Sequence, residues 1–222
     1  MDIKFWHEKW QSNEIGFNQP QPNQLMQRYF PTLHLKPGDR IFVPLCGKSI
    51  DMLWLAGQGY KVIGIEISEL ACKAFFQENK IRVKITEAGD FIVYTSPEIT
   101  LLTGDFFKLD TNHLGKIDAV YDRAALIALP AEVRQLYSAH LAQLVAPETK
   151  MMLIATSYDQ TAMQGPPFSV DEKEVRALFG SHFDIKQLYS KPVSEVPAHL
   201  QDRGLQQATE QVYYLTGKKA PK

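Results

Sequence analysis

The sequence lacks the long apolar segments that would tie the chain to a membrane. Its apolar runs, such as MMLIA at residues 151–155, are far shorter than the roughly 20 residues that a membrane-spanning helix needs. The first residues, MDIKFWHEKW, also lack the basic and apolar regions of a secretory signal. We therefore expect a cytoplasmic protein that does not cross a membrane.

The sequence also has few cysteines, no closely spaced histidines and almost no net charge. The two cysteines, Cys46 and Cys72, have no CxxC spacing, which predicts two buried, reduced thiols. The six histidines show no HExxH motif or paired metal spacing, so we expect no metal. Lys and Arg number 24 against 25 Asp and Glu, which leaves no overall field to attract nucleic acid or an anionic membrane.

What the sequence does contain is a regular alternation of apolar strands and helices from Arg40 onward. The run KVIGIEI is apolar almost throughout, which is typical of a strand in a parallel sheet buried on both faces. The predicted strands are 40–45, 61–67, two hairpin arms within 90–107, one strand within 116–126, then 150–158, 183–190 and 210–217. The predicted helices are 49–60 with Ser49 as N-cap, 68–79 capped by Ser68, 130–145 opened by Pro130, and 169–180 with a Ser169/Glu172 capping box.

This order predicts an α/β fold with a Rossmann-like, doubly wound, mostly parallel sheet, helices on both faces and a C-terminal antiparallel hairpin. We expect one domain over residues 1–222, with the core at 39–222. Residues 1–38 should hold two short helices, the first presenting Trp6 and Trp10 on one face and the second starting at Asn23.

The stretch RIFVPLCGKSIDM, residues 40–52, ends in Gly-Lys-Ser and so suggests a phosphate-binding loop. That loop needs a glycine five positions before Gly47, where this chain has Phe42 within the strand. The better interpretation is the first strand-to-helix turn of a Rossmann-like site, with Gly47 allowing close approach of a ligand. A dinucleotide fingerprint would need two further glycines, so the pattern favours a nucleoside cofactor without a pyrophosphate.

The second predicted strand ends in Glu66, 19 residues after Gly47. An acidic residue at about this spacing accepts hydrogen bonds from the ribose hydroxyls of a nucleotide cofactor. A role at the strand end, capping the next helix, stays open. The two features together indicate a cofactor that contains adenosine but no phosphate tail, and S-adenosylmethionine is such a compound.

Two further strand ends are candidates for the same crevice. Asp105 and Phe106 follow the third strand, where the first would meet the exocyclic amine of an adenine and the second its face. A tight turn with a core phenylalanine is the open alternative. Asp122 and Arg123 end the strand predicted within 116–126, where they either face the cofactor or form a structural ion pair.

Three segments, WHEKWQSNEIGFNQPQPNQLM, VPLCGKSIDMLWLAGQGYKVIGIEIS and GKIDAVYDRAALIAL, resemble the thiopurine S-methyltransferase family in its bacterial form. The resemblance extends over nearly the whole chain, and PLCGKSxDM is its most specific part. It implies an amino-terminal lid and the following contacts: Trp10, Leu45 through its carbonyl, Glu66 and Arg123 with S-adenosylmethionine, Asp105 and Phe106 with the adenine, and Phe17 with the substrate. The short segment SYDQTAMQGPPFS after Thr156 departs from the family, and we expect its residues 164–168, with Pro167 and Phe168, to line the substrate side.

We therefore expect an enzyme that transfers a methyl group to the sulfur of a small aromatic or heterocyclic thiol. The resemblance also implies selenium and tellurium compounds as acceptors. Arg123 cannot be a free base and is expected to stabilise charge. The alternatives are an O- or N-methyltransferase, which a histidine or carboxylate base near the methyl group would favour, a non-catalytic binder of adenosine compounds, and a nicotinamide dehydrogenase. We expect a monomer.

Overall fold

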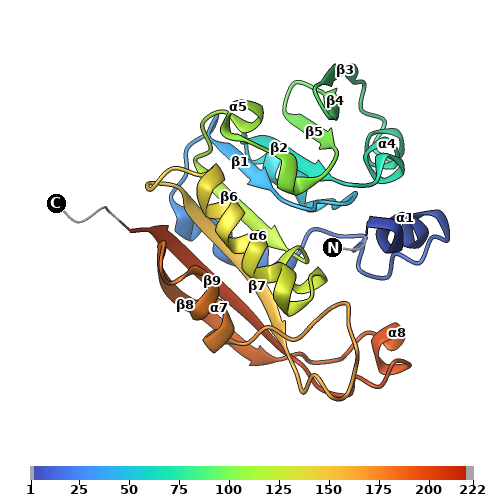
Figure 1. The fold of residues 1–222 in the computed structure, drawn as a ribbon, viewed down its shortest axis with the longest axis vertical. Helices are drawn as coiled ribbons and strands as arrows, with labels where there is room; N and C mark the ends of the chain where they lie inside the picture. Colours follow the sequence, from blue (N-terminus) through green and yellow to red (C-terminus); the bar gives the residue numbers. More distant parts are fainter. Residues whose placement is uncertain (1–2, 219–222) are drawn as a thin grey trace.

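The computed structural model describes residues 3–218 of this chain, and its strands form one nine-stranded sheet in the order β3-β4-β5-β2-β1-β6-β7-β9-β8 (Figure 1). The strands are β1 (Arg40–Val43), β2 (Lys61–Glu66), β3 (Lys84–Ala88), β4 (Phe91–Thr95), β5 (Ile99–Thr103), β6 (Ala119–Arg123), β7 (Lys150–Ser157), β8 (Phe183–Pro192) and β9 (Thr209–Gly217).

The centre of this sheet is parallel, from β5 through β2, β1 and β6 to β7. Antiparallel strands flank it, with β4 and β3 beyond β5 and with β9 and β8 beyond β7. The predicted parallel core and the C-terminal antiparallel hairpin are therefore confirmed, whereas the sheet as a whole is mixed, because antiparallel strands are added at both of its edges. β3 was not predicted, because all five of its residues are exposed and carry no apolar alternation.

Helices cover both faces of the sheet, as expected. Along β1, Phe42 packs in one apolar cluster with residues of α6 and α7, whereas Ile41 and Val43 pack in another with residues of α2, α3 and α4. The helices are α1 (Ile3–Gln11), α2 (Gln24–Tyr29), α3 (Asp51–Gly57), α4 (Glu69–Glu78), α5 (Thr111–Leu114), α6 (Ala131–Leu144), α7 (Glu172–Phe179) and α8 (Ala198–Gln201), with 3-10 turns η1 (Phe30–Leu33), η2 (Phe106–Lys108) and η3 (Leu126–Ala128).

Two of the predicted helix caps are wrong. The N-cap of α3 is Ile50 and not Ser49, whose hydroxyl instead accepts a hydrogen bond from Arg123 Nη2. The N-cap of α7 is Asp171, whose carboxylate accepts the backbone N–H of Glu174 at 2.8 Å. In both cases the serine hydroxyl that could have capped the helix is hydrogen-bonded to a residue outside that helix, Arg123 for Ser49 and Tyr158 for Ser169.

The predicted cap of α4, the predicted start of α6 and the two buried thiols are confirmed. Ser68 caps α4 by accepting the backbone N–H of Ala71, and α6 begins directly after Pro130. Cys46 and Cys72 are free and buried. Between residues 3 and 218, none of the helices combines the length and apolarity that crossing a membrane requires. The same residues contain no group of three or more His, Cys, Asp or Glu side chains arranged to hold a metal ion.

Candidate functional site

A cavity of about 620 Å³ lies at the edge where the parallel strands end, a size suited to a small-molecule ligand. Its walls come from the amino-terminal segment, the turns after β1, β2 and β6, the ends of β7 and β9, the loop at residues 165–167, and α8. In Figure 1, α1 and α8 both lie at the right of the view, with α1 next to α4. Open α/β sheets bind their ligands at this edge.

The backbone is strained where two adjacent strands reach the cavity. Leu45 after β1 and Ala124 after β6 both have left-handed backbones, with φ of 44° and 64°. This conformation is unfavourable for residues other than glycine and clusters at functional sites. Gly47, with φ of 53°, completes the turn, and an added Cβ there would lie 3.1 Å from Trp10 Cζ2. A side chain at position 47 would therefore crowd the Trp10 ring.

Glu66 is buried at the end of β2 and lines the cavity. Its Oε2 accepts the backbone N–H of Gly47 at 2.8 Å, and its Oε1 accepts that of Ser68 at 2.9 Å. Burial raises the pKa of Glu66, and the hydrogen bonds from these amides oppose that shift. Each carboxylate oxygen has two acceptor sites. Glu66 thus holds the turn and the start of α4 in place and keeps acceptor capacity for ligand hydroxyls.

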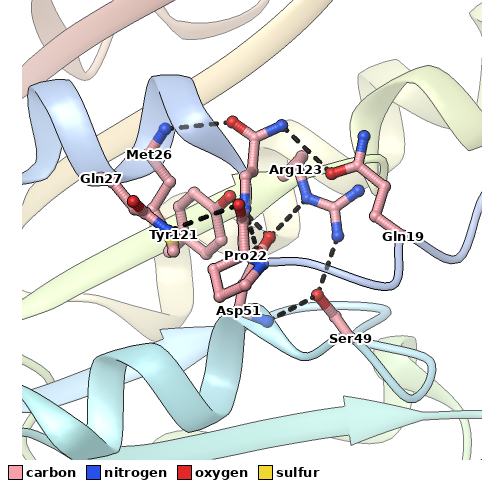
Figure 2. A network of polar contacts seen from close by, with 9 residues as sticks. Gln19, Pro22, Met26, Gln27, Ser49, Asp51, Tyr121 and Arg123 are labelled. Atoms are coloured by element: carbon pink, nitrogen blue, oxygen red, sulfur yellow. Dashed lines mark hydrogen bonds and ion pairs between the residues drawn. The ribbon is translucent and has the colours of Figure 1, made fainter.

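Arg123 is held by a buried polar network that joins three parts of the chain (Figure 2). Its Nε donates to Asp51 Oδ2 at 2.6 Å and its Nη2 to Ser49 Oγ at 2.8 Å. Asp51 is fully buried and also accepts the Tyr121 hydroxyl and the backbone N–H of Asn23, each at 2.8 Å. The network therefore connects the amino-terminal segment, at Asn23, to the Arg123 guanidinium that lines the cavity.

Arg123 stays a cation in this environment. Burial acts to lower its pKa, but the pKa is raised overall because Tyr121 and Asp51 favour the charged guanidinium. Its neighbour Asp122 takes no part in this ion pair. Asp122 faces the opposite side of β6 and accepts the Tyr137 hydroxyl at 2.7 Å, as the alternation along a strand requires.

Seven of the predicted site residues line one cavity: Trp10, Phe17, Leu45, Gly47, Glu66, Arg123 and Pro167. Three do not. Phe106 is 1% exposed and stacks on Phe42 in the core, which matches the alternative of a core phenylalanine and not a contact with adenine. Asp105 accepts the backbone N–H of Phe107 at the start of η2, and the Phe168 ring lies beside the Arg134 guanidinium.

The amino-terminal segment forms an aromatic wall over the cavity. Phe17 makes edge-to-face contacts with Trp10 and Trp6, with ring centroids 5.5 and 5.8 Å apart. The segment also meets α8, since an added Cβ on Gly16 would lie 2.9 Å from His199 Nε2. Apolar rings of this kind suit a cationic sulfonium and a flat heterocycle.

Several residues that line the cavity were missed by sequence reasoning: Thr156, His199, Arg203 and Glu210. The position of Glu210 in the predicted strand 210–217 could have identified it from the sequence. It lies near the start of an apolar strand, and the start of an antiparallel strand lies at the same edge as the ends of the parallel strands. The first residues of such a strand are therefore candidate site residues, as are the last residues of the parallel strands.

Comparison with known sequences gives a consistent family. A family model described as "Thiopurine S-methyltransferase (TPMT)" matches residues 1–218. A curated thiopurine S-methyltransferase of Pseudomonas fluorescens is 43% identical over 98% of this chain and 100% of its own length. One of Pseudomonas aeruginosa is 42% identical over 97% of this chain and 99% of its own.

Solved structures resemble this one in fold. Magnesium protoporphyrin IX methyltransferase of Synechocystis, solved with bound SAH, aligns with a TM-score of 0.66 at 18% identity, over 98% of this chain and 100% of that one. A Burkholderia thailandensis N1-methyltransferase solved with S-adenosylhomocysteine has the same TM-score at 14% identity, over 98% of this chain and 87% of that one. This chain therefore has the same fold as these two methyltransferases.

Proposed function

This chain belongs to the thiopurine S-methyltransferase family, and on that premise we propose that it transfers the methyl group of S-adenosylmethionine to the sulfur of aromatic and heterocyclic thiols, thiopurines among them. The observation that carries this proposal is the pairing of Glu66 and Arg123 in one cavity. The carboxylate suits the ribose hydroxyls of the cofactor, and the guanidinium suits its carboxylate. When bound, S-adenosylmethionine supplies an electrophilic methyl group on a sulfonium.

The residues around the first turn would hold this cofactor. Glu66 accepts the ribose hydroxyls, and Gly47 lets the chain approach the ligand closely. Leu45 offers its backbone carbonyl from a left-handed turn that already points this part of the chain toward the cavity. Trp10 covers the turn, and Arg123 binds the carboxylate or stabilises an anionic acceptor. An adenine contact by Asp105 stays a prediction.

The acceptor would lie between the aromatic wall and the opposite loop. Phe17 and Pro167 both line the cavity and offer flat apolar surfaces to a heterocycle. The task of these residues is to align the sulfur with the methyl group and to exclude water, because in-line displacement depends on alignment. Residues 1–38 then act as a lid over the core at 39–222. A monomeric state and a cytoplasmic location stay predictions.

An O- or N-methyltransferase is the second candidate, because Glu210 and His199 line the cavity and either side chain could serve as a base. An acceptor screen that follows the release of S-adenosylhomocysteine tests both, using a thiopurine, thiophenol, phenol and selenite. We expect methylation of the two thiols. Turnover of phenol without turnover of either thiol would contradict the proposal, and turnover of selenite would test the implied selenium chemistry.

A further inference from the structure

Glu210 is a partly buried carboxylate on the cavity wall to which the proposed S-methyl transfer assigns no role. Among residues 3–218, no hydrogen bond or ion pair of the structure involves its side-chain oxygens, although burial raises the pKa of the carboxyl. Partly buried carboxylates are costly to desolvate without a partner. A ligand that donates a hydrogen bond would remove this cost.

The sheet places Glu210 at the acceptor end of the cavity. It pairs with Thr156 across β7 and β9, and both side chains line the cavity. Glu66 is on β2, and the strand order β2-β1-β6-β7-β9 separates the two carboxylates by four strand spacings, roughly 19 Å at the usual 4.8 Å per spacing. With Glu66 assigned to the ribose, Glu210 is beyond Arg123, at the part of the cavity farthest from the ribose along the sheet.

The charged groups around Glu210 leave it available to a ligand. Lys191 pairs with it across β8 and β9 but is exposed, and no ion pair joins the two side chains in the described structure. Arg203 lines the same part of the cavity, and its guanidinium donates to the carbonyls of Pro166 and Gly165 at 2.6 and 2.9 Å. His199 is the other titratable side chain on this wall.

From this geometry we propose that Glu210 accepts the ring N–H of a heterocyclic thione and acts as the base that makes its sulfur nucleophilic. The inference rests on the proposed function. A thiopurine in its thione form carries a ring N–H beside the C=S group, and loss of that proton places negative charge on sulfur. A carboxylate at the acceptor end selects such heterocycles over thiols that have no ring N–H.

The proton and electron balance is simple. The ring nitrogen loses its proton to Glu210, and the electron pair of that N–H bond forms a ring C=N bond. The C=S π electrons thereby become a sulfur lone pair, which forms the new bond to the methyl carbon. The electron pair of the broken methyl–sulfonium bond stays on the cofactor's sulfur. Glu210 ends neutral and returns its proton to water when the product leaves.

The test compares Glu210→Gln with the unchanged protein on two acceptors, 6-thiopurine and thiophenol, which lacks a ring N–H. We expect kcat/KM for 6-thiopurine to fall by about 100-fold or more, in the range of general base catalysis, with thiophenol unaffected. Titration of 6-thiopurine into the complex with S-adenosylhomocysteine should show weaker binding, while the affinity for S-adenosylhomocysteine stays the same. Glu195→Gln, an exposed residue before α8, is the matched control.

The pH profile assigns the proton. The rate with 6-thiopurine should fall as pH drops through the pKa of Glu210, and Glu210→Gln should lack this limb whereas His199→Gln keeps it. The loss in Glu210→Gln should shrink above the acceptor's own pKa, because solvent then removes the ring proton. Equal losses on both thiols, or no loss on either, would overturn the role of Glu210. If the unchanged protein methylates neither thiol, the proposed function fails, and the inference fails with it.

Discussion

Glu66 is bonded through both carboxylate oxygens to backbone amides, so its replacement alters the turn as well as the ligand contact. Glu66→Ala should weaken S-adenosylmethionine binding by about 1–3 kcal/mol, since the ligand hydroxyls and two buried amides lose their acceptor. Calorimetric titration measures this change. Glu66→Gln is the matched variant, because it keeps the shape and one acceptor oxygen and should lose less. An unchanged affinity in Glu66→Ala would reduce Glu66 to a strand-end residue.

The same residue predicts a pH dependence of cofactor binding. Burial raises the pKa of Glu66, and protonation would remove its capacity to accept on one oxygen. Affinity for S-adenosylmethionine should therefore be full above this pKa and decline as pH falls through it. Glu66→Gln should not show this decline, and titrations of both proteins at several pH values between neutral and acid conditions make the comparison.

Asp51 is the residue on which the Arg123 network depends. Asp51→Asn leaves the buried guanidinium without its counter-charge, so the free energy of unfolding should fall by about 3–5 kcal/mol, as for other broken buried pairs. Denaturant unfolding measures it. Asp90→Asn, which breaks the exposed ion pair with Lys108, is the control and should have little effect. Equal effects of the two variants would show that the buried pair contributes no more to the free energy of unfolding than the exposed pair does.

Individual site residues differ in how readily the sequence predicts them. Glu66 and Arg123 end apolar strands, so their place at the ligand edge follows from the parallel fold alone. Asp51 looks like an ordinary acidic residue in the first turn of a helix. Only the packing of α3 against β6 and the chain at Asn23 shows that it is fully buried and bonded to Arg123. Such roles depend on contacts between residues far apart in the sequence.

At the scale of elements, adjacent side chains of β6 point to opposite faces of the sheet. Asp122 links β6 to α6, because its carboxylate accepts the hydroxyl of Tyr137. Burial raises the pKa of Asp122 to about 6, above its usual 3.8. The unfolded chain therefore ionises first, and stability falls as pH rises from about 4 to about 6. The free energy of unfolding of the unchanged protein, relative to Asp122→Asn, should drop by about 3 kcal/mol across this window and stay constant above it.

The measurement is denaturant unfolding of both proteins at pH 4, 5, 6 and 7. Asp159→Asn is a control of opposite sign, because hydrogen bonds from Thr161 lower the pKa of Asp159. The advantage of the unchanged protein over Asp159→Asn should therefore stay constant from pH 7 to pH 4 and be lost only at lower pH, as a further measurement at pH 3 would show. A difference between the unchanged protein and Asp122→Asn that is independent of pH would show that Asp122 is not the buried acid described.

Elements with strong apolar periodicity were the ones that the sequence predicted. The strands β1, β2, β6 and β7 are buried, and their apolar runs indicate this directly. The exposed edge strand β3 and the short helices α5 and α8 have no such pattern, because few of their side chains face the core. The wrong caps at Ser49 and Ser169 have a related cause, since each hydroxyl is engaged by a residue from another part of the fold.

For the whole molecule, the position of the amino-terminal segment decides how cofactor binding affects dynamics. Trp10 lies against Gly47, Phe17 lines the cavity, and the chain at Asn23 is bonded to the buried Asp51. The segment is thus anchored at its far end, while most residues between Gln11 and Pro20 are exposed. A ligand in the cavity adds contacts to the less buried part.

Binding should therefore slow hydrogen exchange most in residues 5–19, and it should raise the free energy of unfolding by about 2.7 kcal/mol at a ligand concentration 100 times Kd. Exchange measured by mass spectrometry with and without S-adenosylhomocysteine makes the comparison. Peptides over β3 provide the internal reference, since this edge strand contributes nothing to the cavity wall. Protection spread evenly over the sheet would mean that the ligand stabilises the core alone, and that residues 1–38 are a fixed wall and not a lid.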